Sequence, residues 1–351
     1  MMRIKSIDFE AHFYTRAIFE YLRTRKDYPL VTKNKYFEGI DLQFSDQISL
    51  FQTPNFLDIL CDVGENRIKL MDEAGLEKQI LSFSSPGIDE FYPDTQSAST
   101  FATEINDLLF ETIQRYPKRF MGFAAIAPYD VKNAVKELER CITQLGFVGW
   151  LPHSNFGCGT YLDDKTYWPL LEAAQALSIP IYIHPTAPLT KEFGSYGFAL
   201  AGPPFGFQVD AALSFLRMVY AGVFDTFPKL KIILGHMGEM LPFLMPERID
   251  WAYKNPNVST LDGFIASRPQ IKRTANEVIL ENVFFTTSGR FSKPLLNYML
   301  ETIGEDRILF ATDHPYENLK QGMDFIKTSG LSIEILDKIY YQNAKHVGIS
   351  L

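Results

Sequence analysis

Eight short apolar runs, separated by longer segments of helical pattern, limit what this chain of 351 residues can fold into. Each run is almost continuously apolar, as in parallel strands that helices cover. The segment 100–116 (TFATEINDLLFETIQRY) shows the pattern between the runs, because its apolar residues recur every three or four positions. The predicted strands are 4–10, 78–83, 119–127, 147–151, 179–184, 230–236, 283–288 and 307–313.

Eight strands that alternate with helices predict an α/β fold, the TIM (β/α)8 barrel. The chain is longer than a typical barrel, and the surplus falls in an aromatic-rich insertion over about 14–66 and a long loop over about 185–208. Both follow strands, so both are expected at the C-terminal face, where barrel enzymes keep their sites. No linker or repeat divides the sequence, and we expect residues 1–351 to form a single domain.

Composition argues against several classes of partner. The formal net charge is −8 and no basic stripe occurs, which argues against nucleic acid as a partner. The longest uncharged stretch, 193–209, is interrupted by Gly and Pro and is too short to cross a membrane, and the N-terminus lacks the apolar run of a signal peptide. The three cysteines form no CxxC pair. We therefore expect a cytoplasmic protein with reduced cysteines.

The stretch IDFEAHF (7–13) places two ligand-type side chains near the end of the first strand. Glu10 and His12 are two positions apart, so strand alternation predicts that they share a face. The apolar side chains of the stretch are predicted to take the other face: Ile7, Phe9 and Phe13. A polar pair of this kind either binds a metal or only caps a turn.

Three further strands end in the same kind of side chain. His184 closes the fifth predicted strand, His236 the sixth and Asp313 the eighth. In a barrel the carboxyl ends of all strands meet at one face, so these residues should converge with Glu10 and His12. One such residue would usually be structural, whereas four strands that share the feature favour a common site. Two imidazoles and two carboxylates suit one divalent ion, Zn²⁺ or Mn²⁺ before Mg²⁺.

Several blocks of the sequence resemble the amidohydrolase superfamily, in its amidohydrolase 2 branch. They are the first-strand motif, the IHP after the fifth strand, MDEAGLEKQILSF (71–83), FPKLKIILGHMGEMLPF (227–243) and RILFATDHPYEN (307–318). Most hydrolases of the superfamily begin with His-x-His and often carry a carboxylated lysine on strand four. Here Glu10 replaces the first histidine, and the fourth strand continues as GFVGWLPHSN without a lysine. A Glu-x-His opening with GHMGE is similar to the metal-dependent hydroxybenzoate decarboxylases, the 2,3-dihydroxybenzoate and gamma-resorcylate enzymes among them, and more distantly to aminocarboxymuconate-semialdehyde decarboxylase.

The resemblance implies a nonoxidative decarboxylase of a small ortho-hydroxylated aromatic acid, reversible in principle. The implied ligands of its single divalent ion are Glu10, His12, His184 and Asp313. Asp313, once protonated, would deliver a proton to the ring carbon that bears the carboxylate, and His236, oriented by Glu239, would hold or relay a proton at the phenolic oxygen. The hydroxyl should be ortho, because only an ortho oxygen can share one ion with the carboxylate.

Four other polar residues have less definite roles. Arg248, in PERIDW, lies near the position of a substrate-contacting arginine of the family, although the segment here is one residue longer; a surface role is the alternative. His153 follows the fourth strand and is predicted to line the pocket, or else to cap a loop. His314 and His346 are predicted to be structural.

Two other classes of function stay open on the same barrel. A metal-dependent hydrolase of a lactone, amide or ester, or a hydratase, could use Asp313 as its base, and a binding or assembly protein would need no turnover at all. The stretch 210–227 is apolar over more of its circumference than an outer barrel helix needs. This favours a homodimer or homotetramer, as in the family, unless the long loops cover that face.

Overall fold

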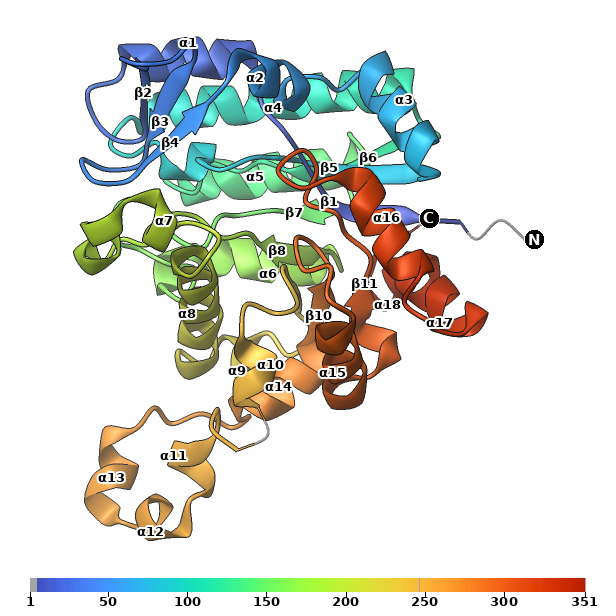
Figure 1. The fold of residues 1–351 in the computed structure, drawn as a ribbon. Helices are drawn as coiled ribbons and strands as arrows, with labels where there is room; N and C mark the ends of the chain where they lie inside the picture. The colour runs from blue at the N-terminus through green and yellow to red at the C-terminus, as the bar shows by residue number, and fades with distance from the viewer. Residues whose placement is uncertain (1–4, 246, 351) are drawn as a thin grey trace.

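The computed structural model describes residues 5–245 and 247–350. At its centre is an eight-stranded parallel sheet, β1–β5–β6–β7–β8–β9–β10–β11 in spatial order. Backbone hydrogen bonds join the first strand to the segment after the last: Phe9 N donates to Phe310 O at 3.0 Å and His12 N to His314 O at 2.7 Å. The sheet therefore closes on itself as the predicted (β/α)8 barrel, with helices around it (Figure 1).

All eight predicted strands are present with different ends. Their bounds are β1 (Ile7–Phe13), β5 (Lys78–Phe83), β6 (Phe120–Ala124), β7 (Gly149–Trp150), β8 (Pro180–Ile183), β9 (Lys231–Leu234), β10 (Val283–Thr286) and β11 (Ile308–Leu309). The first strand begins three residues later than predicted and extends to Phe13; residue 4, the predicted start, lies outside the described residues. The last strand ends at Leu309, well before Asp313, whose φ of 67° lies outside the extended region.

Helices follow the strands and cover the outside of the barrel. They are α3 (Glu65–Ala74), α4 (Thr95–Arg115), α5 (Val131–Thr143), α6 (Trp168–Ala176), α8 (Gly206–Tyr220), α14 (Ala275–Asn282), α15 (Lys293–Ile303) and α16 (Leu319–Lys327). Inside the barrel, every strand except β7 contributes buried side chains to one cluster, among them Phe9, Ile80, Phe123, Tyr182 and Ile233. Val347 and Ile349, at the end of α18 (Asn343–Val347), join the same cluster. Val347 and Ile349 therefore contribute to the barrel core.

A β-bulge in β1 changes the predicted alternation of its side chains. Asp8 pairs with Gln79 and Ala11 with Leu81, so β1 uses three residues where β5 uses two. The extra residue resets the alternation, as bulges do at barrel rims. Ile7 and Phe9 consequently lie in the cluster inside the barrel, together with the side chains of the other strands.

Glu10 also faces the barrel interior, because its carboxylate is bonded to the hydroxyl of Tyr182 within that cluster. The prediction that Ile7 and Phe9 lie on the face opposite Glu10 and His12 was therefore wrong. Only Phe13 takes the outer face, in the core between sheet and helices. The bulge lets Ile7 and Phe9 pack in the barrel core, while Glu10 and His12, further along β1, are presented to the site.

The two predicted insertions are ordered structures that contact each other. Residues 14–66 form α1 (Arg16–Thr24), an antiparallel sheet of β2 (Leu30–Lys33), β3 (Ile40–Gln43) and β4 (Ser49–Gln52), and α2 (Pro54–Leu60). The loop 185–208 contains α7 (Phe198–Ala201). Ile48 of the first insertion packs with Ala187 and Ala201 of the second. Figure 1 shows β2–β4 beside α7 at one end of the barrel.

A third excursion was not predicted. After α10 (Leu241–Leu244), the helices α11 (Trp251–Lys254), α12 (Pro256–Ser259) and α13 (Asp262–Ser267) project away from the barrel at the lower left of Figure 1. The predicted apolar helix 210–227 is split into α8 and α9 (Val223–Thr226) by Gly222, whose φ is +78°. Of its large apolar side chains only Leu213 is exposed, so the chain itself covers most of that face. No helix in the described ranges has the length and apolar character needed to cross a membrane.

Candidate metal centre

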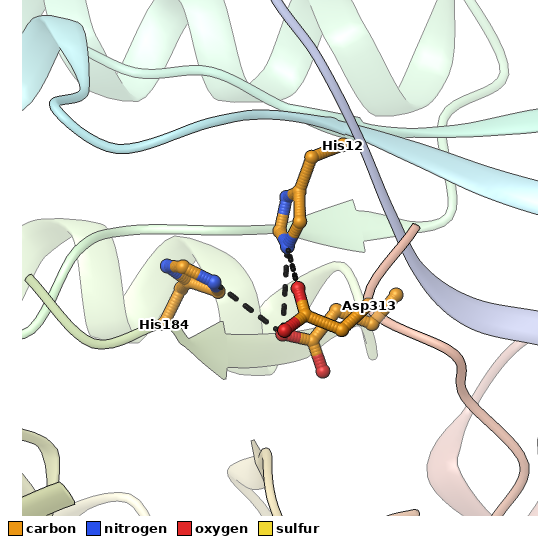
Figure 2. Close-up of side chains that lie close together, drawn as sticks. His12, His184 and Asp313 are labelled. Carbon is orange, nitrogen blue, oxygen red and sulfur yellow. Dashed lines mark ion pairs between the residues drawn. The ribbon is translucent and has the colours of Figure 1, made fainter. Parts of the chain in front are cut away.

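The four residues predicted as metal ligands meet at the carboxyl ends of the barrel strands. Glu10 and His12 come from β1, His184 directly follows β8, and Asp313 follows β11. One nitrogen or oxygen atom of each lies within 4.8 Å of the others. Figure 2 shows His12 and His184 pointing toward Asp313. The barrel thus brings together side chains from the two ends of the sequence.

The distances within this group are those of atoms that face a common point. Glu10 Oε1 lies 3.3 Å from His184 Nε2 and 3.5 Å from His12 Nε2. His12 Nε2 lies 3.2 Å from Asp313 Oδ1. Asp313 is placed there by the closure of the barrel, because its backbone N–H donates to Glu10 O at 3.0 Å.

Two of these atoms lack a hydrogen-bond partner anywhere in the part of the chain that the structure describes. They are Glu10 Oε1 and His12 Nε2, both in fully buried side chains. A buried polar atom without a partner is costly and calls for an explanation, such as an ion. A cation between a carboxylate and imidazole nitrogens would satisfy both atoms, and the mixed nitrogen and oxygen set suits Zn²⁺ or Mn²⁺. The residues present therefore fit a divalent metal ion.

Three of the four side chains are held in forms that bind a cation, whereas Asp313 and Glu10 raise the pKa of His12 to about 9 in spite of its burial. Burial alone would raise the pKa of Glu10, but the neighbouring histidines hold it well below the ordinary value. The neighbouring His12 and His236 side chains lower the pKa of Asp313 in spite of its burial. Burial lowers the pKa of His184 to about 4, which keeps this imidazole neutral. Ionised carboxylates and a neutral imidazole are the forms that bind metal ions.

His236 and Glu239 stand beside this group as a pair. His236 Nδ1 lies 2.6 Å from Glu239 Oε1, and Glu239 is fully buried. His236 Nε2 faces the centre, 3.6 Å from Asp313 Oδ2 and 3.7 Å from Glu10 Oε1. Burial would lower the pKa of His236, but Glu239 and Glu10 raise it well above the ordinary value. This imidazole is therefore oriented by one carboxylate and can hold or move a proton at its other nitrogen.

The backbone is unusual where these side chains are presented. Five residues of the site have positive φ, between 51° and 68°: His236, Met237, Glu239, Met240 and Asp313. Ser178 is the only other non-glycine residue with positive φ among those described. This region is unfavourable for residues with a Cβ, and proteins concentrate such conformations at functional sites.

The remaining predicted site residues lie elsewhere. Arg248 is exposed and is not among the residues that line the cavity at the metal centre. His153 is buried behind His184, at a ring separation of 5.3 Å, and its Nδ1 lies 2.9 Å from Asp89 Oδ1. His314 is buried next to the closure of the barrel, and His346 is exposed on α18.

The residues that orient the ligands were not predicted. Tyr182 donates its hydroxyl hydrogen to Glu10 Oε2, and Ser82 Oγ lies 3.1 Å from His12 Nδ1. Tyr182 precedes His184 by two positions within the predicted strand 179–184, so strand alternation could have placed both on one face. Ser82 carries no signal of its own, because its role depends on pairing between β1 and β5.

A cavity of about 480 Å³ opens onto the metal centre. His184, His236, Glu239 and Asp313 line one part of it, and aromatic side chains line much of the rest. Gly289 leaves space there, because a Cβ at this position would lie 3.4 Å from the His236 ring and 3.7 Å from Asp313 Oδ2. The cavity can admit a small organic molecule against the polar group.

Fold and site together define a metal-dependent enzyme built on a (β/α)8 barrel. The profile of the amidohydrolase family matches residues 7–347, and the chain belongs to this family.

Named relatives and solved structures narrow the comparison. Gamma-resorcylate decarboxylase of Polaromonas sp. strain JS666 is 39% identical over 302 residues, which cover 84% of this chain and 90% of that protein. A crystal structure of 2,6-dihydroxybenzoate decarboxylase in complex with 2,6-dihydroxybenzoate has a TM-score of 0.81, 31% identity and 98% coverage of both chains. The structure of a dihydroxybenzoic acid decarboxylase from Polaromonas sp. JS666, with bound manganese and the inhibitor 2-nitroresorcinol, has a TM-score of 0.80 and 34% identity, and covers 98% of this chain and 96% of that chain.

Proposed function

We propose that this chain is a metal-dependent carboxy-lyase that removes CO₂, without an oxidant, from an ortho-hydroxylated aromatic acid. The observation that carries the proposal is the convergence of the four ligand-type side chains beside the His236–Glu239 pair, at the wall of a cavity that can hold an aromatic ring. The similarity to gamma-resorcylate decarboxylase over most of both chains supports the same reaction class.

Four side chains are proposed to hold one divalent ion: Glu10, His12, His184 and Asp313. The bound ion would supply positive charge that holds the carboxylate and the ortho oxygen of the substrate at the centre. Mn²⁺ is the first choice, since a solved relative contains manganese, with Zn²⁺ next and Mg²⁺ third.

The chain's own residues are proposed to move the protons. Asp313, when protonated, delivers its proton to the ring carbon that bears the carboxylate. The bond from that carbon to the carboxylate then breaks, its electron pair restores the aromatic ring, and CO₂ leaves. His236 holds a proton at the phenolic oxygen. Its Nε2 lies 3.6 Å from Asp313 Oδ2, close enough to exchange a proton with Asp313. Glu239 acts through His236 as a positioning residue.

Incubation of the Mn²⁺-loaded protein with hydroxybenzoates tests this function. We expect 2,6-dihydroxybenzoate to give 1,3-dihydroxybenzene and CO₂, and 4-hydroxybenzoate and benzoate to remain unchanged, because neither carries an oxygen ortho to the carboxylate. High bicarbonate should drive the reverse carboxylation. Equal turnover of 4-hydroxybenzoate and its ortho isomer would contradict the ortho rule. Hydrolysis of a lactone, with no CO₂ released from any acid, would favour the hydrolase alternative.

We further propose that the chain acts in the cytoplasm as one domain and as a homodimer or homotetramer. Three cysteines without a disulfide support a reducing compartment: Cys61, Cys141 and Cys158. Exposed apolar side chains near α10, Phe243 and Leu244, offer a surface for association. No nucleic acid or membrane partner is proposed.

A further inference from the structure

The cavity at the metal centre is larger than one substituted ring requires. Its volume is about 480 Å³, roughly three times that of an engineered cavity of about 150 Å³ that binds benzene. The additional volume can hold a further group of the substrate, and the side chains around it indicate the chemical character of that group.

One wall of the cavity is aromatic and starts at the metal centre. The Tyr316 ring lies 5.9 Å from the His12 ring, and the Phe56 ring lies 5.3 Å from the Tyr316 ring. Tyr316 follows β11, and Phe56 comes from α2 in the first insertion. This wall therefore leads outward from the polar group along apolar surface.

A second aromatic wall comes from both insertions. The Phe44 and Phe198 rings are stacked 6.0 Å apart, and the Phe207 ring meets the Phe198 ring edge-on at 5.5 Å. Leu50 of β4 also lines the cavity on the insertion side. All four side chains are only partly buried, so apolar surface is left for a ligand to cover.

In the part of the cavity away from the metal centre, here called the outer cavity, polar side chains are fewer than apolar ones. Gln208 is occupied, because its Nε2 donates to Pro203 O at 2.9 Å and to Pro204 O at 3.2 Å. Apart from the proposed ligands and the His236–Glu239 pair, the charged residues that line the cavity are Arg290 and Glu317. Most of the surface offered to a ligand beyond the metal centre is therefore apolar.

We propose that the natural substrate is an ortho-hydroxylated benzoic acid with an apolar ring substituent, an alkyl chain or a second ring, that sits between these two walls. This inference rests on the proposed decarboxylase function and adds a subsite to it. The carboxylate and the ortho hydroxyl take the metal end, and the substituent takes the end built by Phe44, Leu50, Phe56, Phe198 and Phe207.

A series of substrates tests the subsite on the native Mn²⁺-loaded protein. The parent is 2,6-dihydroxybenzoate, and the series carries methyl, propyl or pentyl groups at each free ring position. Burial of one methylene contributes about 0.8 kcal/mol, so kcat/KM should rise roughly fourfold for each methylene at the best position until the subsite is full. Equal kcat/KM along the series at every position would overturn the subsite. Failure of every acid to lose CO₂ would instead overturn the proposed function on which it rests.

Two neighbouring residues of β4 provide a matched pair of variants. Leu50 lines the cavity, whereas Phe51 points to the other side of the strand and packs against Phe37 at 5.9 Å. Leu50→Trp should lower the ratio of kcat/KM for the pentyl acid over the parent by at least about tenfold, the loss of two or more buried methylenes. Phe51→Trp should keep the native ratio. A preference for a ring with a second carboxylate, lost in Arg290→Met, would overturn the proposal and assign the outer cavity to an anion.

Discussion

At the metal centre, side chains present one polar atom because their other polar atom is bonded elsewhere. Tyr182 is hydrogen-bonded to Glu10 Oε2 and Ser82 to His12 Nδ1. Glu239 is hydrogen-bonded to His236 Nδ1. His184 is the exception, since its Nδ1 has no partner among the described residues. Such contacts fix which atom faces the centre and in which orientation.

Removal of the Tyr182 hydroxyl should weaken metal binding. Tyr182→Phe leaves Glu10 Oε2 with only the longer hydrogen bond from Thr286 Oγ1, at 3.4 Å, so the carboxylate is less firmly oriented. We expect affinity for Mn²⁺ to fall by roughly 10- to 100-fold, measured by titration against a competing chelator. Tyr340→Phe is the matched control, because the Tyr340 hydroxyl is also buried and bonds no described residue. An unchanged affinity in Tyr182→Phe would show that Glu10 needs no such support.

His236 should be needed for turnover and not for the metal. His236→Ala removes the group assigned to the phenolic proton while the four proposed ligands stay in place. We expect turnover to be abolished and metal content, measured by elemental analysis, to stay near one ion per chain. His346→Ala, on the exposed face of α18, should change neither quantity. Loss of the ion from His236→Ala would mean that His236 is itself a ligand.

Glu90 should make the protein less stable as the pH rises. Its carboxyl is buried and accepts hydrogen bonds from Gly87 N at 2.8 Å and Thr186 Oγ1 at 2.8 Å. Burial raises its pKa from 4.5 to about 7, so the folded protein binds this proton more tightly than the unfolded chain does. The stabilisation is complete below pH 4.5 and is lost as the pH rises through 7.

Glu90→Gln should therefore reduce this part of the pH dependence. Relative to the native protein, the variant should gain up to about 3 kcal/mol of unfolding free energy between pH 5 and pH 8, because it has no carboxyl to ionise. Urea unfolding of the metal-loaded protein at a series of pH values measures the difference. Glu139→Gln changes an exposed carboxyl on α5 and should follow the native pH profile. A parallel profile for Glu90→Gln would contradict the prediction.

At the scale of the element, Asp8 holds the bulge of β1 in place. Its carboxylate accepts hydrogen bonds from Gln79 Nε2 on β5 at 3.1 Å, and from Thr312 N at 2.9 Å and Thr312 Oγ1 at 2.6 Å after β11. It also accepts from the backbone N–H of Glu10, at 3.2 Å, within the bulge. One buried side chain thus joins the strands on either side of β1 and fixes the backbone that presents Glu10.

Asp8→Ala should cost stability and metal affinity together. Loss of the carboxylate leaves buried donors of Gln79 and Thr312 unsatisfied, at a cost of about 2–4 kcal/mol in unfolding free energy. Asp8→Asn should cost less, because its amide oxygen can still accept from the backbone. Asp27→Ala, on an exposed segment, is the control. Chemical denaturation and metal titration measure both effects, and native metal affinity in Asp8→Ala would show that the bulge holds without it.

At the scale of the whole molecule, the state of association decides whether more than one chain works together. The apolar stretch 210–227, which favoured an oligomer, is largely covered by its own chain, so an interface has to use other surfaces. Phe243 is 56% exposed and stacks on Tyr298 at 4.8 Å, which makes α10 and α15 the best-defined surface.

Light scattering after gel filtration should give two or four times the chain mass. Phe243→Glu should lower it toward one chain, and Tyr36→Glu, also at an exposed aromatic, should not. A native protein that elutes as a single chain would contradict the proposed oligomer.

Local patterns along the chain were enough to predict the barrel and the four candidate ligands. Apolar runs and helical periodicity are local properties, and a parallel barrel brings the carboxyl ends of its strands to one face whatever lies between them. Residue types at those ends, such as His184 and Asp313, were therefore enough to predict a common site before any contact was known.

Contacts between distant segments set the side-chain register of β1, the support of Glu10 and the extent of the cavity. The face that Phe9 and Glu10 take depends on one extra residue relative to β5, and the bond from Tyr182 depends on a strand far along the chain. The cavity walls come from two insertions that meet in space, and Arg248 lies outside them. These features depend on pairing and packing between distant segments, and no local sequence pattern encodes them.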